Sequence, residues 1–325
     1  MKRILVIKLS SLGDIAHALP AVRALKERTG ADIDWVTQSE YAGLLKCCSD
    51  VNRIISFPRR AVLRNGFLFL RALRRHKYDV IVDLQGLLKS ALVARLARGD
   101  RRIGPAWARE GAHHVYQAQP PRPVGPRQHA VDELMNVVDL IAPGEDIPSD
   151  LHFHFPDAES DGRPGPHVAF APFSRWITKD WPAEKFVEVG RRLAKEMGCR
   201  ISILGARENE VAGATMARQI GPGAHNLCGR TDLVGLCSVL KEMDLLITVD
   251  SGPMHWADAM GVPLVAIFGA TDPARTGPYH QLDHVVTQPG LDCRPCHSRS
   301  CAREDLACLR TLEVEAVFQS ALLRL

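Results

Sequence analysis

A short polar loop near the start of the chain contains residues that could act as an acid or a base. Residues 10–14 read Ser-Ser-Leu-Gly-Asp and lie where an apolar strand pattern gives way to a helical one. In that place the Asp14 carboxylate could accept a proton from an attacking hydroxyl group. Gly13 would let the backbone approach a ligand closely. Asp and Ser also suit the cap of a helix N-terminus, and position alone slightly favours the cap.

A second polar loop has the features of a diphosphate site. Residues 250–255 read Asp-Ser-Gly-Pro-Met-His, follow a strongly apolar strand and open a helix. The backbone N–H groups and the dipole at such a helix N-terminus favour an anion. Asp250, Ser251, Gly252 and His255 are therefore candidate contacts. The loop is neither a GxGxxG nor a P-loop, and its pattern fits a structural cap equally well.

Three further polar loops follow expected strands in the second half of the chain. A lysine in the first of them could neutralise charge that develops on a departing diphosphate. A carboxylate in the second stands where ribose hydroxyls are commonly bound. Each loop is a weak signal, but four such loops at one edge of a sheet together indicate a ligand site. The candidates are Ser174 and Lys179 in the first loop, Glu208, Asn209 and Glu210 in the second, and Thr271 in the third.

Four of the nine cysteines gather near the end of the chain, at Cys293, Cys296, Cys301 and Cys308. Four thiolates could supply a tetrahedral zinc site. The last two gaps in the series do not match the paired CxxC knuckles, so a reduced, cysteine-rich surface loop is the preferred interpretation. We therefore expect no metal and no cofactor. A disulfide framework is not expected in a chain of this size that stays in the cytoplasm.

Apolar strands alternating with amphipathic helices would position these loops. The alternation occurs twice, on either side of the polar, Pro- and Gly-rich residues 156–166. This pattern predicts an α/β protein of two facing Rossmann-like, doubly wound domains, residues 1–155 and 156–325. The last helix, Glu313 to Leu323, could pack on either domain. Strands are expected at residues 3–8, 32–37, 53–56, 80–84, 167–171, 200–204, 245–249 and 263–268.

Composition indicates a water-soluble protein of 325 residues, with 46% hydrophobic and 24% charged residues. The apolar runs are too short to span a bilayer, and no signal peptide is evident, so a cytoplasmic location is expected. Residues 59–127 carry 15 Lys and Arg but only 4 Asp and Glu, and such a stretch can bind phosphates. Its segment 62–77 could lie on an anionic membrane surface, although a core-facing helix with a basic outer side is mildly preferred.

Several stretches of the chain resemble the bacterial lipopolysaccharide heptosyltransferases, the glycosyltransferases of family 9 with the GT-B fold. The S-L-G-D opening and the D-S-G-x-x-H loop are the most specific of them. Within the family, the sequence looks more like the enzymes that add the first inner-core heptose than those that add the second. The matching stretches are residues 4–20, 80–98, 178–182, 249–259 and 268–273.

The resemblance implies that the chain transfers heptose from ADP-L-glycero-β-D-manno-heptose to Kdo on lipid A, inverting the anomeric carbon without a metal. It makes Asp14 the general base, and it brings the 10–14 loop opposite the 250–255 loop across a cleft whose closure excludes water. Lys179 then acts in catalysis and binds the donor. The resemblance assigns the donor to Gly13, Ser174, Glu208, Asn209, Glu210, Asp250, Ser251, Gly252, His255 and Thr271, and the acceptor phosphates and carboxylates to Arg59, Arg60, Arg64 and Arg109.

Two departures from the family pattern leave alternatives open. Asn209 stands where relatives place the ribose-binding glutamate, so Glu208 or Glu210 takes that role here. The cysteine-rich tail leaves the acceptor open, with heptosyltransferase II or another family 9 transferase acting on a later core acceptor as the alternative. A non-catalytic nucleotide- or nucleic-acid-binding protein is the alternative of another class. An aromatic content of 6% without a stacking platform disfavours nucleic acid, whereas peripheral contact with the inner membrane surface stays possible.

Overall fold

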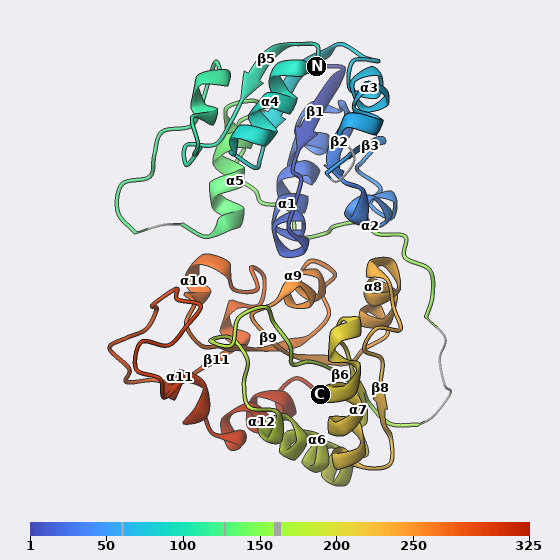
Figure 1. The fold of residues 1–325 in the computed structure, drawn as a ribbon, viewed down its shortest axis with the longest axis vertical. Coiled ribbons are helices and arrows are strands. Elements are labelled where there is room, and N and C mark those ends of the chain that lie inside the picture. The colour runs from blue at the N-terminus through green and yellow to red at the C-terminus, as the bar shows by residue number, and fades with distance from the viewer. Residues whose placement is uncertain (60–61, 127, 159–163) are drawn as a thin grey trace. The chain divides into compact units, whose positions relative to one another are not determined.

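The computed structural model describes residues 1–59, 62–126, 128–158 and 164–325. The chain divides into two compact units, Met1–His154 and Phe155–Leu325 (Figure 1). Each unit is built around one sheet of parallel strands with helices between them, which confirms the expected α/β class.

The first unit has a five-stranded sheet in the order β3-β2-β1-β4-β5. Two inner strands of this sheet contain uninterrupted apolar runs, residues 4–7 and 80–82, as strands covered on both faces require. The strands are β1 (Arg3–Ile7), β2 (Asp32–Gln38), β3 (Arg53–Phe57), β4 (Tyr78–Asp83) and β5 (Gly99–Ile103), and the helices are α1 (Leu12–Thr29), α2 (Ala42–Lys46), α3 (Val62–Leu73), α4 (Leu88–Leu96) and α5 (Ala130–Asp139), with short 3₁₀ turns η1 (Ser39–Tyr41) and η2 (Ala112–Val115).

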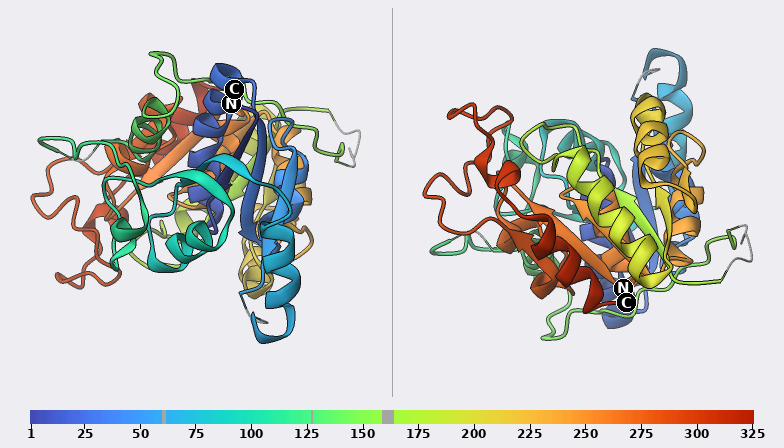
Figure 2. Two further views of the ribbon diagram at one scale, coloured as in Figure 1. Left: turned by 90° about the horizontal axis from the view of Figure 1, so that it is seen from above. Right: turned by 90° about the horizontal axis from the view of Figure 1, so that it is seen from below.

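Helices cover both faces of this sheet. Figure 2 (left) shows α1 in dark blue on one face, and α3 and α4 in lighter blue and teal on the other. Leu73 of α3 and Val93 of α4 pack into the same apolar cluster as Leu5 and Ile7 of β1. The inner sides of α3 and α4 therefore belong to the core of the unit, as the core-facing interpretation of residues 62–77 expects.

The second unit has a six-stranded sheet in the order β11-β10-β9-β6-β7-β8. Residues of β6, β7, β9 and β10 form its core with α6 and α12. The strands are β6 (His167–Ala171), β7 (Arg200–Ile203), β8 (Ala224–Asn226), β9 (Leu245–Val249), β10 (Leu264–Phe268) and β11 (Val285–Thr287), and the helices are α6 (Ala183–Met197), η3 (Arg207–Asn209), α7 (Glu210–Ile220), α8 (Leu233–Lys241), α9 (Gly252–Ala259), α10 (Pro273–Thr276), η4 (Leu282–His284), α11 (Ala307–Arg310) and α12 (Val314–Leu322).

The structure adds three strands that the sequence did not predict, β5, β8 and β11. All three lie at the edges of the sheets. β5 exposes Asp100 and Arg101, and β8 and β11 have only three residues each. An edge strand needs no continuous apolar run, because water covers part of it, so the apolar pattern that found the central strands is missing here.

The last helix, α12, packs on α6, β10 and β11 within the second unit. Val317, Phe318 and Ala321 form its buried side. Within the described residues, no helix has the length and apolar composition that crossing a membrane requires.

Candidate active site

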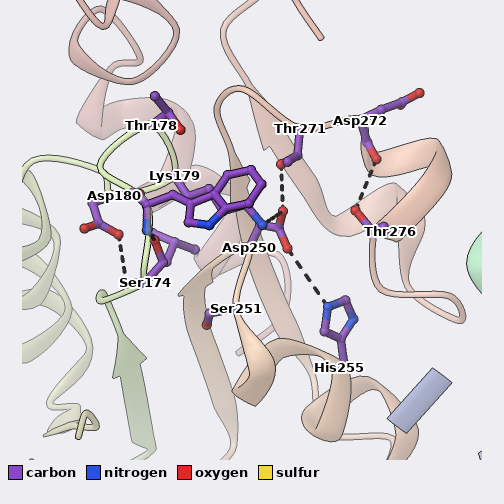
Figure 3. A network of polar contacts seen from close by, with 12 residues as sticks. Ser174, Thr178, Lys179, Asp180, Asp250, Ser251, His255, Thr271, Asp272 and Thr276 are labelled. Carbon is purple, nitrogen blue, oxygen red and sulfur yellow. Dashed lines mark hydrogen bonds and ion pairs between the residues drawn. The ribbon is translucent and has the colours of Figure 1, made fainter. Parts of the chain in front are cut away.

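Three loops of the second unit meet at the carboxyl edge of its sheet. Ser174 and Lys179 follow β6, Asp250 follows β9, and Thr271 follows β10. Because β10, β9 and β6 are neighbours in the sheet, their carboxyl ends lie side by side. The structure thus brings together residues that the sequence selected from separate loops (Figure 3).

The Asp250 carboxylate joins these loops. One of its oxygens, Oδ2, lies 2.7 Å from the Lys179 ammonium and accepts a 2.7 Å hydrogen bond from the Thr271 hydroxyl. The other oxygen, Oδ1, lies 4.0 Å from Nε2 of His255. Asp250 is only 4% exposed, so its charge is compensated by these neighbours rather than by water. In this arrangement Asp250 orients a cation and a hydroxyl.

Helix α9 begins beside Asp250. Its N-cap residue, Ser251, has an extended backbone and makes no capping hydrogen bond with its side chain. Thr248 Oγ1 lies 3.4 Å from the Ser251 hydroxyl. The first-turn N–H groups of a helix have no acceptor within the helix. With Ser251 and Gly252 at this end, the site suits an anionic group.

The loop after β6 is stabilised by its own polar groups. The Ser174 N–H donates to the Asp180 carboxylate at 2.8 Å, and the Ser174 hydroxyl donates to the Trp176 carbonyl at 2.9 Å. Burial raises the pKa of Asp180, which the hydrogen bonds from Ser174 partly oppose. Lys179 Nζ lies 4.7 Å from the centre of the Trp176 ring. Sequence reasoning gave Trp176 and Asp180 no role, although both lie beside the selected lysine.

The three candidates for ribose binding differ in their surroundings. Asn209 Oδ1 accepts a 3.0 Å hydrogen bond from the Ala206 N–H and so caps its own turn. Glu208 and Glu210 are exposed. The ribose-binding role of Glu208, Asn209 or Glu210 stays a prediction.

Asp14 lies in the first turn of α1 in the first unit. One oxygen of its carboxylate accepts hydrogen bonds from both the N–H and the hydroxyl of Ser11, each at 2.7 Å. The capping interpretation of this loop is therefore correct, and it fixes the orientation of the carboxylate. The Leu9 and Ser10 N–H groups both donate to the side-chain oxygen of Gln85, which ties this loop to the one after β4.

A buried lysine that the sequence reasoning passed over lies close to Asp14. Lys8 Nζ donates to the Leu84 carbonyl at 2.9 Å. Burial lowers the pKa of Lys8, while the charges of Asp14, Asp83 and Glu133 raise it. A lysine directly after the apolar residues 4–7 was the signal in the sequence.

The structure describes both the backbone and the side chain of two of the four candidate acceptor arginines. Arg59 follows β3 and donates to the Gln38 side chain at 3.4 Å, whereas the Arg109 N–H donates to the Gly86 carbonyl after β4. Both residues are exposed. Arg60 and the side chain of Arg64 lie outside the described residues. The two placed arginines lie at the same edge of the sheet as Asp14.

The four clustered cysteines differ in burial. Cys293 and Cys296 are exposed, Cys301 is partly buried, and Cys308 is buried in α11. Burial raises the pKa of the Cys308 thiol. Across the described residues, no three His, Cys, Asp or Glu side chains come together in a way that could hold a metal.

Two Rossmann-like units, with polar loops at the carboxyl edges of their parallel sheets, are the architecture of the GT-B glycosyltransferases. The chain belongs to glycosyltransferase family 9, the heptosyltransferase family, which matches residues 67–307. The expected family and enzyme class are thereby confirmed.

Relatives and solved structures extend this similarity over nearly the whole chain. It is 31% identical to lipopolysaccharide heptosyltransferase 1 of Pseudomonas aeruginosa, over 92% of this chain and 87% of that one. It is 28% identical to the protein of the same name from Escherichia coli K12, over 88% of this chain and 94% of that one. The structure of E. coli heptosyltransferase WaaC with ADP is 27% identical, superposes with a TM-score of 0.79, and covers 99% of this chain and 100% of its own. The expected GT-B fold is confirmed by this likeness.

Proposed function

We propose that the protein transfers L-glycero-D-manno-heptose from ADP-heptose to Kdo of lipid A, in the synthesis of the lipopolysaccharide inner core. The observation that carries the proposal is the Lys179–Asp250–Thr271 cluster at the carboxyl edge of the second sheet. The structural relative named above binds ADP. A cation beside a helix N-terminus is what the diphosphate of such a donor needs.

The proposed reaction is a single displacement that inverts the anomeric carbon. An acceptor hydroxyl attacks that carbon while the bond to the diphosphate oxygen breaks, and ADP leaves. Asp14 takes the proton of the attacking hydroxyl. Lys179 neutralises the charge that develops on the diphosphate, and its ion pair with Asp250 keeps it oriented before the reaction.

Acceptor binding is assigned to the arginines of the first unit. Arg59 and Arg109 lie exposed at the carboxyl edge of the first sheet, where Asp14 also lies. The planar guanidinium group forms paired hydrogen bonds with phosphates and carboxylates. A Kdo carboxylate or a lipid A phosphate is a ligand of this kind.

Transfer to the lipid is the direct test. Purified protein is mixed with ADP-heptose and Kdo-lipid A, and the lipid is analysed by mass spectrometry. We expect a mass increase of one heptose. Transfer only to a lipid that already carries a heptose would instead assign the second enzyme of the pathway, and no transfer to either lipid would contradict the proposal.

We further propose that the first unit docks on the anionic membrane that contains the acceptor. Residues 62–77 and 84–99, which include α3 and α4, contain no Asp or Glu and many basic residues. Phe67 and Leu68 of α3 are 76% and 63% exposed. Exposed apolar side chains among basic ones are typical of surfaces that bind anionic lipid. On α4, Leu88, Leu92 and Leu96 are 44%, 51% and 47% exposed.

Vesicle binding tests this surface. We expect the protein to sediment with phosphatidylglycerol vesicles, which lack any acceptor, and not with phosphatidylcholine vesicles. Leu92→Glu should weaken binding about ten-fold, because it removes an inserted side chain and adds a repelling charge. Leu323→Glu is the matched control, since Leu323 is 82% exposed in the second unit. If Leu92→Glu and Leu323→Glu bound the vesicles equally well, the proposed membrane-binding surface would be contradicted.

A further inference from the structure

The cysteine-bearing segment, residues 291–306, lies against the two loops that carry Lys179 and Thr271. The Thr178 hydroxyl donates to the Ser298 carbonyl at 2.7 Å, and the His297 N–H donates to the Ala270 carbonyl at 2.8 Å. Arg294 Nε donates to the Gly269 carbonyl at 2.6 Å. The segment is therefore bonded to the immediate neighbours of Lys179 and Thr271.

The same segment places a second cation against the indole ring that Lys179 contacts. The Arg299 guanidinium lies 4.8 Å from the centre of the Trp176 ring, and the Lys179 ammonium lies 4.7 Å from the centre of that same ring. An indole attracts cations electrostatically. The Trp176 ring thus contacts two positive groups, and they come from segments far apart in the sequence.

The two cations differ in their remaining partners. Lys179 is paired with Asp250, which compensates its charge. In the described part of the chain Arg299 forms no ion pair, and its side chain is exposed. Arg303, on the same segment, is paired with the Asp305 carboxylate at 3.0 Å. Of these two arginines, Arg299 is the one whose guanidinium is available to an anion.

The charge of a bound diphosphate would require a second cation at the site. The diphosphate of a nucleotide-sugar carries two negative charges, and Asp250 already compensates Lys179. A guanidinium can form two parallel hydrogen bonds with phosphate oxygens, which an ammonium cannot do. Arg299 contacts the same indole ring as Lys179, the residue proposed to neutralise the charge on the diphosphate.

We propose that Arg299 is a further donor-binding residue that contacts the diphosphate of the nucleotide-sugar beside Lys179. Trp176 holds the guanidinium in place, and the hydrogen bonds of the cysteine-bearing segment position Arg299 at the site. The inference rests on the proposed function, because it takes the ligand to be a nucleoside diphosphate sugar. It gives the cysteine-bearing segment a role that requires no metal.

Calorimetric titration with ADP and with adenosine tests this assignment. Arg299→Ala should weaken ADP binding about ten- to hundred-fold, as loss of a charged hydrogen bond does, and leave adenosine binding unchanged. The affinity of Arg299→Lys for ADP should lie between those of the wild type and of Arg299→Ala. Arg303→Ala is the matched control from the same segment and should bind ADP like the wild type. In the transfer assay, Arg299→Ala should raise the KM for ADP-heptose more than it lowers kcat.

Three outcomes would overturn the assignment. If Arg299→Ala binds ADP as the wild type does, the guanidinium does not contact the diphosphate. If it weakens ADP and adenosine equally, the residue only supports the fold of the loops. If the wild type itself binds no ADP, the proposed function fails together with this inference, which distinguishes that result from the first two.

Discussion

Replacing Asp14 by Asn should lower kcat for heptose transfer by about 10²- to 10⁴-fold, the usual contribution of a general base. The amide can still accept the hydrogen bond that the Ser11 N–H donates to Asp14 in the structure. The start of α1 should therefore keep its geometry while the proton acceptor is lost. Mass spectrometry of the lipid product over time measures the loss.

The capping role of Asp14 supplies the control. Ser11→Ala removes the hydroxyl that donates to the Asp14 carboxylate, but it leaves the carboxylate itself. The Ser11 N–H still donates to Asp14, so the change removes one hydrogen bond, worth about 1 kcal/mol of stability, and does not remove a base. We expect this variant to stay within about ten-fold of wild-type kcat. A Ser11→Ala variant as slow as Asp14→Asn, or an Asp14→Asn variant near wild-type turnover, would remove Asp14 from the base role.

The sequence predicted the central strands and the positions of the loops well. Apolar runs such as β4 and β9 are fully or nearly fully buried, and this burial produces the pattern that identifies them. The loops at their carboxyl ends then follow from the parallel topology. The edge strand β5 was not predicted, because Asp100 and Arg101 face water and break the apolar pattern.

The contacts between loops could not be predicted from the sequence. Lys179 and Asp250 were selected separately, each as a donor contact, but their 2.7 Å ion pair depends on which strands are neighbours in the sheet. The approach of Arg299 to Trp176 depends in addition on the irregular path of the cysteine-bearing segment. Hydrophobic periodicity contains no information about either contact, because neither involves a repeating apolar face.

Replacing Lys179 by Met should lower kcat by about 10²- to 10³-fold, the cost of removing one group that stabilises charge in a transition state. The same change should also destabilise the protein by about 3 kcal/mol, because it leaves the Asp250 carboxylate buried without its cation. The loss of activity and the loss of stability therefore have different causes, and a second substitution can separate them.

Adding Asp250→Asn to Lys179→Met should restore most of the stability and none of the activity. The amide oxygen can still accept the hydrogen bond from the Thr271 hydroxyl, and no unpaired charge remains in the buried position. Thermal unfolding and transfer kinetics of the two single variants and the double variant complete a double-mutant cycle. If activity returned with stability in the double variant, Lys179 would serve the fold and not the departing diphosphate. If stability did not return, the burial of Asp250 would not be what makes the single Lys179 variant unstable.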